Sequence, residues 1–112
     1  MRPTVLVTLV LLLTAIPAGA QTTSTYTTGY VTNVDAQASG LYVLLNDGGA
    51  PPKIVQPLNC NSTNGGWMFI PDTYRTMIAS TLIARSESLN ITIYTSGVSP
   101  TTGYCTITQV VE

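Results

Sequence analysis

The sequence has no histidine, a single lysine and few charged residues of either sign. Charged side chains make up 8% of the 112 residues, against about 25% in an average protein. General acid–base catalysis uses histidine or paired carboxylates, and here the five acidic residues are spread singly along the chain. No base is available to activate a serine or threonine, and the glycine-rich segment NDGGAPP lacks the Lys-Ser/Thr of a phosphate loop. We therefore expect a protein that is not an enzyme and that has no cofactor or metal.

The scarcity of positive charge also limits the partners. The chain has a formal net charge of −1, and beyond its first residues the only cations are Lys53, Arg75 and Arg85. Binding to DNA or RNA depends on lysine and arginine side chains that neutralise several phosphates. We therefore expect no nucleic-acid partner.

The longest apolar stretch lies at the start of the chain. Arg2 precedes an apolar run at residues 5–16, and the small residues Ala-Gly-Ala end at Ala20. This order is typical of a signal peptide that is cleaved on export. The run is shorter than the roughly 20 residues that span a bilayer, and Pro17 ends it. We predict a signal peptide at 1–20, no membrane span after its cleavage, and a periplasmic or secreted location.

The chain has only two cysteines, Cys60 and Cys105. A pair of cysteines in an exported protein is typical of a disulfide bond. The alternative, a metal site, lacks the histidines or further cysteines that zinc requires. We predict a disulfide between Cys60 and Cys105.

The remaining chain predicts one small β-rich domain at 29–112, preceded by a threonine-rich lead-in at 21–28. Short runs of apolar and β-branched residues, bounded by glycine, asparagine and aspartate, predict strands at 29–37, 41–45, 53–60, 89–97 and 104–111. Pro57 suggests that the third strand lies at an edge or contains a bulge. A helix between the third and fourth strands is the element order of an OB-fold, a five-stranded and partly open barrel.

The helix is predicted between Pro71 and the segment RSES at 85–88. Asp72 is placed to cap its first turn, since aspartate is favoured at that position. Apolar residues then recur at the spacing of a helix that buries one face, and these are Tyr74, Met77, Ile78 and Leu82.

Several segments together resemble a known group of proteins. The chain reads G-Y-V-T-N-V, G-L-Y-V-L-L, N-C, W-M-F-I, a helix, I-T-I-Y-T-S-G and Y-C-T-I-T-Q-V. This order resembles small exported bacterial proteins with an OB-type fold, whose characterised relatives are the B subunits of pentameric A-B toxins of the subtilase-cytotoxin type. The resemblance implies a glycan- or protein-binding module and a homo-oligomeric ring. It assigns no binding residue.

The residues themselves indicate one candidate ligand-binding region. The loop N-S-T-N-G-G-W contains neutral amides and hydroxyls beside the only tryptophan, and tyrosines lie in the last two strands. Such groups suit a sugar, which has an apolar face and a rim of hydroxyls. The candidate residues are Asn61, Asn64, Trp67, Tyr94 and Tyr104.

A structural role for the same loop is the alternative. Trp67 would then pack under the helix, and we prefer this position for its side chain because a small domain has few large apolar residues with which to build a core. The loop tip would remain available to a ligand. For the whole chain we expect an exported binding protein, and the alternative is a monomeric periplasmic structural or accessory protein with no small ligand.

Overall fold

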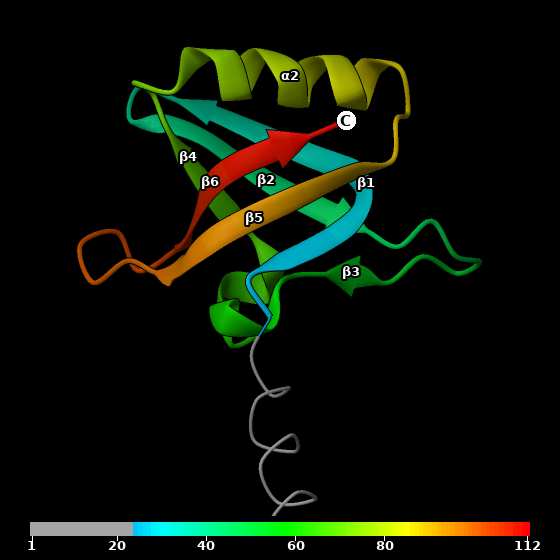
Figure 1. Ribbon diagram of the computed structural model, residues 1–112, viewed down its shortest axis with the longest axis horizontal. Coiled ribbons are helices and arrows are strands. Elements are labelled where there is room, and N and C mark those ends of the chain that lie inside the picture. Colours follow the sequence, from blue (N-terminus) through cyan, green and yellow to red (C-terminus); the bar gives the residue numbers. More distant parts are fainter. Residues whose placement is uncertain (1–23) are drawn as a thin grey trace, which may run out of the picture.

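The computed structural model describes residues 24–112 (Figure 1). The expected signal peptide at 1–20 and the first part of the threonine-rich lead-in lie outside the described residues. Six strands form one mixed sheet. The described elements, in chain order, are β1 (Tyr26–Gln37), β2 (Gly40–Asn46), β3 (Ile54–Val55), the 3₁₀ helices η1 (Leu58–Cys60) and η2 (Thr63–Gly66), β4 (Met68–Pro71), the α-helix α2 (Arg75–Ser86), β5 (Ile91–Val98) and β6 (Cys105–Val111).

The strands pair in a closed circuit. β1 pairs antiparallel with β5 through its first residues and with β2 through the remainder, with an irregularity between Val31 and Asn33. β2 pairs antiparallel with β4, β4 pairs parallel with β6, and β6 pairs antiparallel with β5. The short β3 lies outside this circuit and pairs only with the end of β2.

Alternation along the strands explains where the core lies. In β2 the apolar side chains of Leu41, Val43 and Leu45 are buried, while the residues between them are half-buried. β5 alternates in the same way, with Ile91 and Ile93 buried. Because successive side chains of a strand point to opposite faces, each strand sends one set inward and one set outward. The inward set forms a single core inside the circuit.

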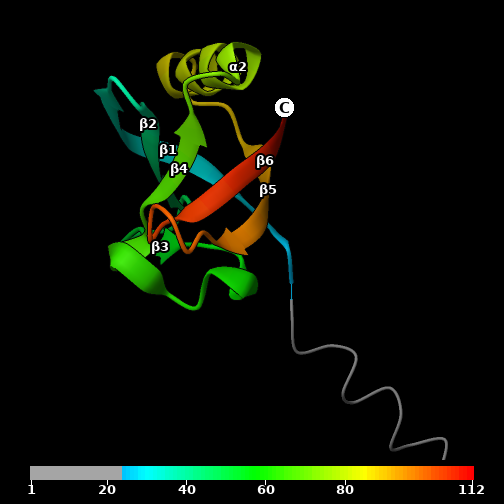
Figure 2. The ribbon, with the colours of Figure 1, turned by 90° about the vertical axis from the view of Figure 1, so that its left-hand side faces the viewer.

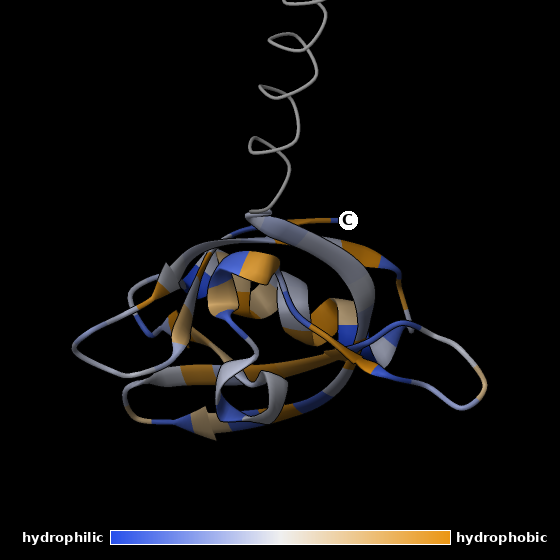
Figure 3. Ribbon diagram, turned by 90° about the horizontal axis from the view of Figure 1, so that it is seen from below, coloured by the Kyte–Doolittle hydropathy of each residue, from blue (hydrophilic) through white to orange (hydrophobic). Residues whose placement is uncertain are grey.

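The helix α2 lies across one end of the strands, and the 3₁₀ helices lie at the other end (Figures 1 and 2). In the view from below, the strands outline a ring, and α2 is seen across the far end of it (Figure 3). The two loops that extend from opposite sides of the domain are drawn largely in the pale colours of intermediate hydropathy in that figure.

The predicted helix is confirmed, but its cap and part of its buried face were wrong. The helix begins at Arg75, and its N-cap is Tyr74, which makes no side-chain capping bond, so Asp72 does not cap it. The fully buried positions of α2 are Thr81 and Ala84, and their small side chains allow the helix to lie close to β1 and β6.

Of the four apolar residues assigned to the buried face, two are largely exposed. Met77 and Ile78 pack against the core as expected. Tyr74 and Leu82 are 53% and 42% exposed. The face of α2 that packs against the strands is therefore not the face that the apolar residues predict: it is rotated about the helix axis toward Thr81 and Ala84.

The third predicted strand is present at the edge of the sheet, as Pro57 suggested, but it is much shorter than expected. Only Ile54 and Val55 of the segment 53–60 pair with another strand, and Leu58–Cys60 forms η1. Pro57 has no N–H to donate to a neighbouring strand, which is consistent with the early end of β3. The strand that completes the circuit is β4, in a segment for which the sequence predicted no strand.

The predicted disulfide is confirmed. Cys60 and Cys105 are bonded, with their Cα atoms 5.3 Å apart, and both residues are fully buried. The bond joins η1 to the start of β6. Within residues 24–112, no helix has the length and apolar character needed to cross a membrane.

Candidate functional site

The candidate site is built on the outer face of the strands. Asp35 of β1 is the register partner of Tyr42 of β2, so the two side chains lie on the same face of the sheet. Val43 and Leu41, on either side of Tyr42, are buried in the core. Tyr42 therefore points outward, and Asp35 stands next to it.

Trp67 and Tyr104 reach the same face from two other strands. Met68 of β4 and Cys105 of β6 are register partners in a parallel pair, and both are buried. The residue before each of them therefore points outward. Because the strands are parallel, this places Trp67 and Tyr104 next to each other, each immediately before the first residue of its strand.

An aromatic row covers this part of the sheet. The ring of Tyr42 lies 4.8 Å from that of Phe69 and 4.9 Å from that of Tyr104, measured between centroids. The contact with Tyr104 is edge-to-face, an arrangement that aromatic pairs favour. Gly40 makes room for the backbone oxygen of Ile70 and for the row, since a Cβ there would clash with that oxygen and would lie 2.8 Å from Cε1 of Phe69.

The outward side chains line a cleft of about 370 Å³. Its lining residues are Asp35, Gln37, Tyr42, Trp67 and Tyr104. Nε2 of Gln37 donates a hydrogen bond to Oδ2 of Asp35 over 3.1 Å, so the amide and the carboxylate are held together. The cleft thus combines three aromatic side chains with a carboxylate that accepts hydrogen bonds and an amide that both donates and accepts them.

The loop before Trp67 is fixed by local geometry. Asn61, Ser62 and Asn64 have positive φ angles of 56°, 53° and 54°, in the left-handed region that asparagine tolerates better than most residues. The hydroxyl of Thr63 donates to the carbonyl of Cys60 over 2.9 Å. These residues wind the chain tightly between the disulfide and β4.

A hydrogen bond connects this loop to the cleft. Nδ2 of Asn64 donates to the carbonyl oxygen of Gly103 over 2.7 Å, directly before Tyr104 in the chain. Together with the disulfide at Cys105, this bond fixes the backbone on both sides of Tyr104. The aromatic wall of the cleft is therefore anchored on a rigid segment.

The structure brings together only part of the predicted ligand-binding set. Trp67 and Tyr104 line the cleft, and Asn64 contacts the chain beside it. Trp67 is half-buried at the cleft, so the preference for a core position was wrong. Tyr94 lies away from the cleft lining, with its ring 5.5 Å from that of Tyr26, and Asn61 is exposed at the end of η1.

Three lining residues were missed by the sequence analysis. Asp35, Gln37 and Tyr42 occupy outward positions at the ends of two strands that the sequence did predict. A signal for them was present, because Asp35 and Gln37 are two positions apart and so share a face of β1. Their proximity to Tyr42 depends on the pairing of β1 with β2, which the sequence pattern does not state.

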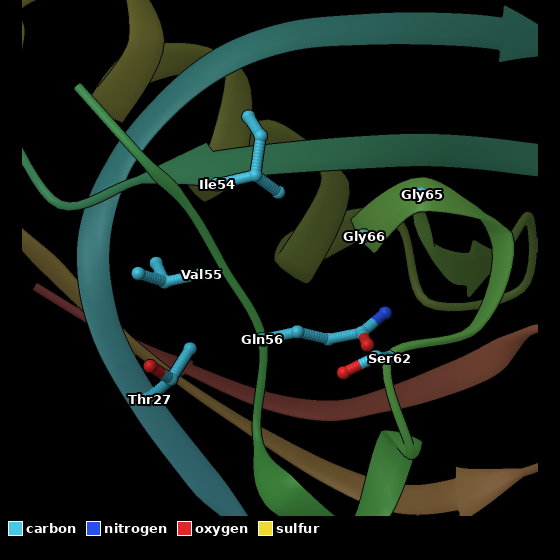
Figure 4. Close-up of a pocket in the computed structure, with 7 residues that line it drawn as sticks. All are labelled: Thr27, Ile54, Val55, Gln56, Ser62, Gly65 and Gly66. Atoms are coloured by element: carbon cyan, nitrogen blue, oxygen red, sulfur yellow. The ribbon is translucent and has the colours of Figure 1, made fainter. Parts of the chain in front are cut away.

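A second cavity, of about 480 Å³, lies beside β3 (Figure 4). It is lined by Thr27, Ile54, Val55, Gln56, Ser62, Gly65 and Gly66. The side chain of Gln56 extends toward Ser62, and its Oε1 is buried without a hydrogen-bond partner (Figure 4). The described residues that line this cavity include no aromatic or charged side chain, so they offer fewer of the groups that recognise a ligand than the aromatic cleft does.

Comparison with protein-family models, with curated proteins and with solved structures gave no match.

Proposed function

We propose that the protein is an exported, non-catalytic binding protein that holds a glycan in the aromatic cleft. The observation that carries the proposal is the lining of the cleft, where an indole, two phenols, a carboxylate and an amide converge on about 370 Å³. A sugar ring presents an apolar face to aromatic planes, and its hydroxyls donate to carboxylates and exchange hydrogen bonds with amides. The volume is near the lower end of the range for small-molecule sites, about 300–1,000 Å³.

An OB-like barrel is part of the same proposal. The closed circuit of pairings and the parallel contact between β4 and β6 support it. If β3, with its two residues, is treated as an addition to β2, five principal strands remain and α2 lies between the third and the fourth. Folds of this type bind oligosaccharides on the outer surface of their strands, where the cleft lies.

Binding without turnover is the third part of the proposal. Asp35 is the only carboxylate among the described residues that line the cleft. Hydrolysis of a glycosidic bond ordinarily requires two carboxyl groups on opposite sides of that bond. The lining is therefore better suited to holding a sugar than to cleaving it.

Assembly into a ring follows from the resemblance to pentameric toxin B subunits. Tyr74, Leu82 and Ile83 of the helix region are 53%, 42% and 48% exposed, and burial against a second copy would remove apolar surface from water. Several weak sites on one ring would bind a glycan-coated surface more strongly than a single site. Light scattering behind a sizing column tests this part: a monomer at micromolar concentration would refute the ring and leave the cleft unaffected.

Trp67 makes the binding test direct. It is the only tryptophan of the chain, so its fluorescence reports on the cleft itself. The oxidised protein is first applied to a glycan array, and each glycan retained is then titrated against the emission of Trp67. We expect saturable binding accompanied by a change in that emission.

Two variants distinguish the cleft from the remaining surface. Trp67→Ala is expected to weaken binding by about 30-fold, the effect of removing a central aromatic contact worth about 2 kcal/mol. Tyr26→Ala removes an exposed aromatic ring outside the cleft lining and should leave the affinity unchanged. Calorimetry measures both variants, since one of them lacks the fluorophore. Unchanged affinity in a folded Trp67→Ala variant, or no retained glycan at all, would contradict the proposal.

A further inference from the structure

The cleft has a charge of one sign only. Asp35 is its single carboxylate, and the other lining residues, which are Gln37, Tyr42, Trp67 and Tyr104, are uncharged at neutral pH. Among residues 24–112, neither lysine nor arginine lines it. The amide of Gln37 directs one of its N–H groups to Oδ2 of Asp35, so this donor is already occupied by the carboxylate. The groups that ordinarily recognise an acidic ligand are therefore missing from the lining.

We propose that the cleft takes uncharged saccharides and rejects acidic ones, and that Asp35 is the residue that determines this specificity. The inference rests on the proposed glycan-binding function and adds the chemical class of the ligand. Asp35 accepts hydrogen bonds from sugar hydroxyls, while Gln37 fixes the orientation of its carboxylate. The aromatic side chains contact the apolar face of the sugar ring.

Hydrogen-bond chemistry explains the preference for hydroxyls. A carboxylate has two oxygens with about four acceptor positions, and Gln37 occupies one of them. Neighbouring hydroxyls of an uncharged sugar can fill those that remain, since each hydroxyl carries a proton to donate. A carboxylate on the ligand has no proton to donate at neutral pH. The oxygens of such a ligand would face the oxygens of Asp35 with no proton between them to form a hydrogen bond.

Electrostatics explains the rejection of acids. A cleft of about 370 Å³ accommodates little more than one or two sugar rings, so an acidic substituent would remain within the Debye length of about 8–10 Å from Asp35. Asp35 is exposed, so water and salt weaken the repulsion between two like charges, but no cation among the described lining residues offsets it. Specificity of this kind comes from an unfavourable contact with the wrong ligand.

The test compares sugars that differ at one carbon. Galactose and galacturonic acid form one pair, and glucose and glucuronic acid form another; each acid replaces a hydroxymethyl group with a carboxylate. The full protein is titrated with each sugar at neutral pH and low salt, and binding is followed by the emission of Trp67. We expect the uncharged member to bind about tenfold more tightly in at least one pair. This ratio corresponds to a repulsion of about 1.4 kcal/mol between Asp35 and the carboxylate of the acidic sugar.

Matched variants assign the effect to Asp35. Asp35→Asn keeps the shape of the side chain and removes its charge, and it should bring the two affinities of a pair to within about threefold of each other, since the repulsion would be gone. Asp72→Asn makes the same change of net charge at an exposed residue outside the cleft lining, and it should leave the ratio as it is in the unaltered protein. Gln37→Glu adds a second negative charge to the cleft and should widen the ratio.

Each outcome separates this inference from the proposed function. Equal or tighter binding of the acidic sugars would overturn the inference, while glycan binding itself would stand. An unchanged ratio in Asp35→Asn would also overturn it, because another group would then set the selectivity. Failure of every sugar, of both these pairs and a wider glycan array, would refute the proposed function instead.

Discussion

Loss of the disulfide is expected to destabilise the domain by about 4 kcal/mol. Cys60 and Cys105 are 45 positions apart in the sequence. In the chain-entropy account, a cross-link that closes a loop of this length raises the free energy of unfolding by about 4 kcal/mol, because it restricts the unfolded chain. A small domain has a total stability of about 5–15 kcal/mol. The disulfide is therefore expected to supply a large share of it.

Three forms of the protein separate the cross-link from the packing of the sulfur atoms. Both cysteines are fully buried, so the variant Cys60→Ala/Cys105→Ala loses side-chain contacts as well as the bond. The fully reduced unaltered protein retains those atoms and loses only the bond. Urea unfolding of the oxidised, reduced and double-variant forms, followed by circular dichroism, gives the three free energies.

The reduced protein should lose about 4 kcal/mol, and the double variant about 1–2 kcal/mol more because of the lost packing. The reduced protein should also bind sugar more weakly, since the disulfide at Cys105 positions the neighbouring Tyr104 in the cleft. A loss below about 1 kcal/mol in the reduced form would refute the argument from loop closure.

Three further predictions concern the scaffold of the cleft. Gly40→Ala should lower the free energy of unfolding by about 3 kcal/mol, because the added Cβ would clash with the backbone oxygen of Ile70 and with the ring of Phe69; a loss below about 1 kcal/mol in urea unfolding would count against that close approach. Oγ1 of buried Thr95 donates to Oδ1 of Asn59 over 2.7 Å, while Nδ2 of Asn59 donates to the backbone carbonyl of Thr95. A double-mutant cycle with Asn59→Ala and Thr95→Val reports the bond between the two side chains and should give a coupling of about 1 kcal/mol; additive losses would exclude it. Backbone N–H groups, chiefly that of Lys53, hold the pKa of the Asp47 carboxyl below its ordinary value. The ionised Asp47 carboxyl stabilises the fold at any pH above its pKa in the unfolded chain, and this contribution is lost as the pH falls through its lower pKa in the folded protein. In urea titrations, Asp47→Asn should therefore lose less stability on acidification than the unaltered protein does. An equal loss in both proteins would refute the assignment.

The sequence predicted the strands that alternate clearly and missed the one that does not. In β5, Ile91, Ile93 and Thr95 are buried between less buried neighbours, which is the pattern that the sequence analysis used. In β4, Met68, Phe69 and Ile70 are all buried, so the run shows no period of two. Phe69 points outward yet is covered by the ring of Tyr42. Its burial thus depends on a contact between strands far apart in the sequence.

The helix shows a similar limit. Its existence followed from the spacing of apolar residues, but the stripe that faces the strands contains Thr81 and Ala84. Hydrophobicity ranks Leu82 above both, although it is 42% exposed. Close packing against the strands favours small side chains, and this requirement is visible only once the helix is docked.

The candidate site was predictable only in part for the same reason. Trp67 and Tyr104 were recognised as aromatic residues near turns, but their proximity follows from the parallel register of Met68 with Cys105. The sequence pattern does not predict which residues of β4 and β6 pair with each other. Asp35 was noticed only as a charge, and it becomes part of a site through the pairing of β1 with β2.

The most direct test of the central claim is to map where a sugar contacts the protein. Two-dimensional ¹H–¹⁵N NMR spectra of the oxidised protein are recorded during titration with galactose and with glucose up to millimolar concentration. The account predicts saturable shifts at the backbone amides of Asp35, Gln37, Tyr42 and Tyr104 and at the indole N–H of Trp67, with the amides of α2 unmoved. Saturable shifts centred on another surface, or no saturable shifts with these sugars or with any glycan of an array, would contradict it.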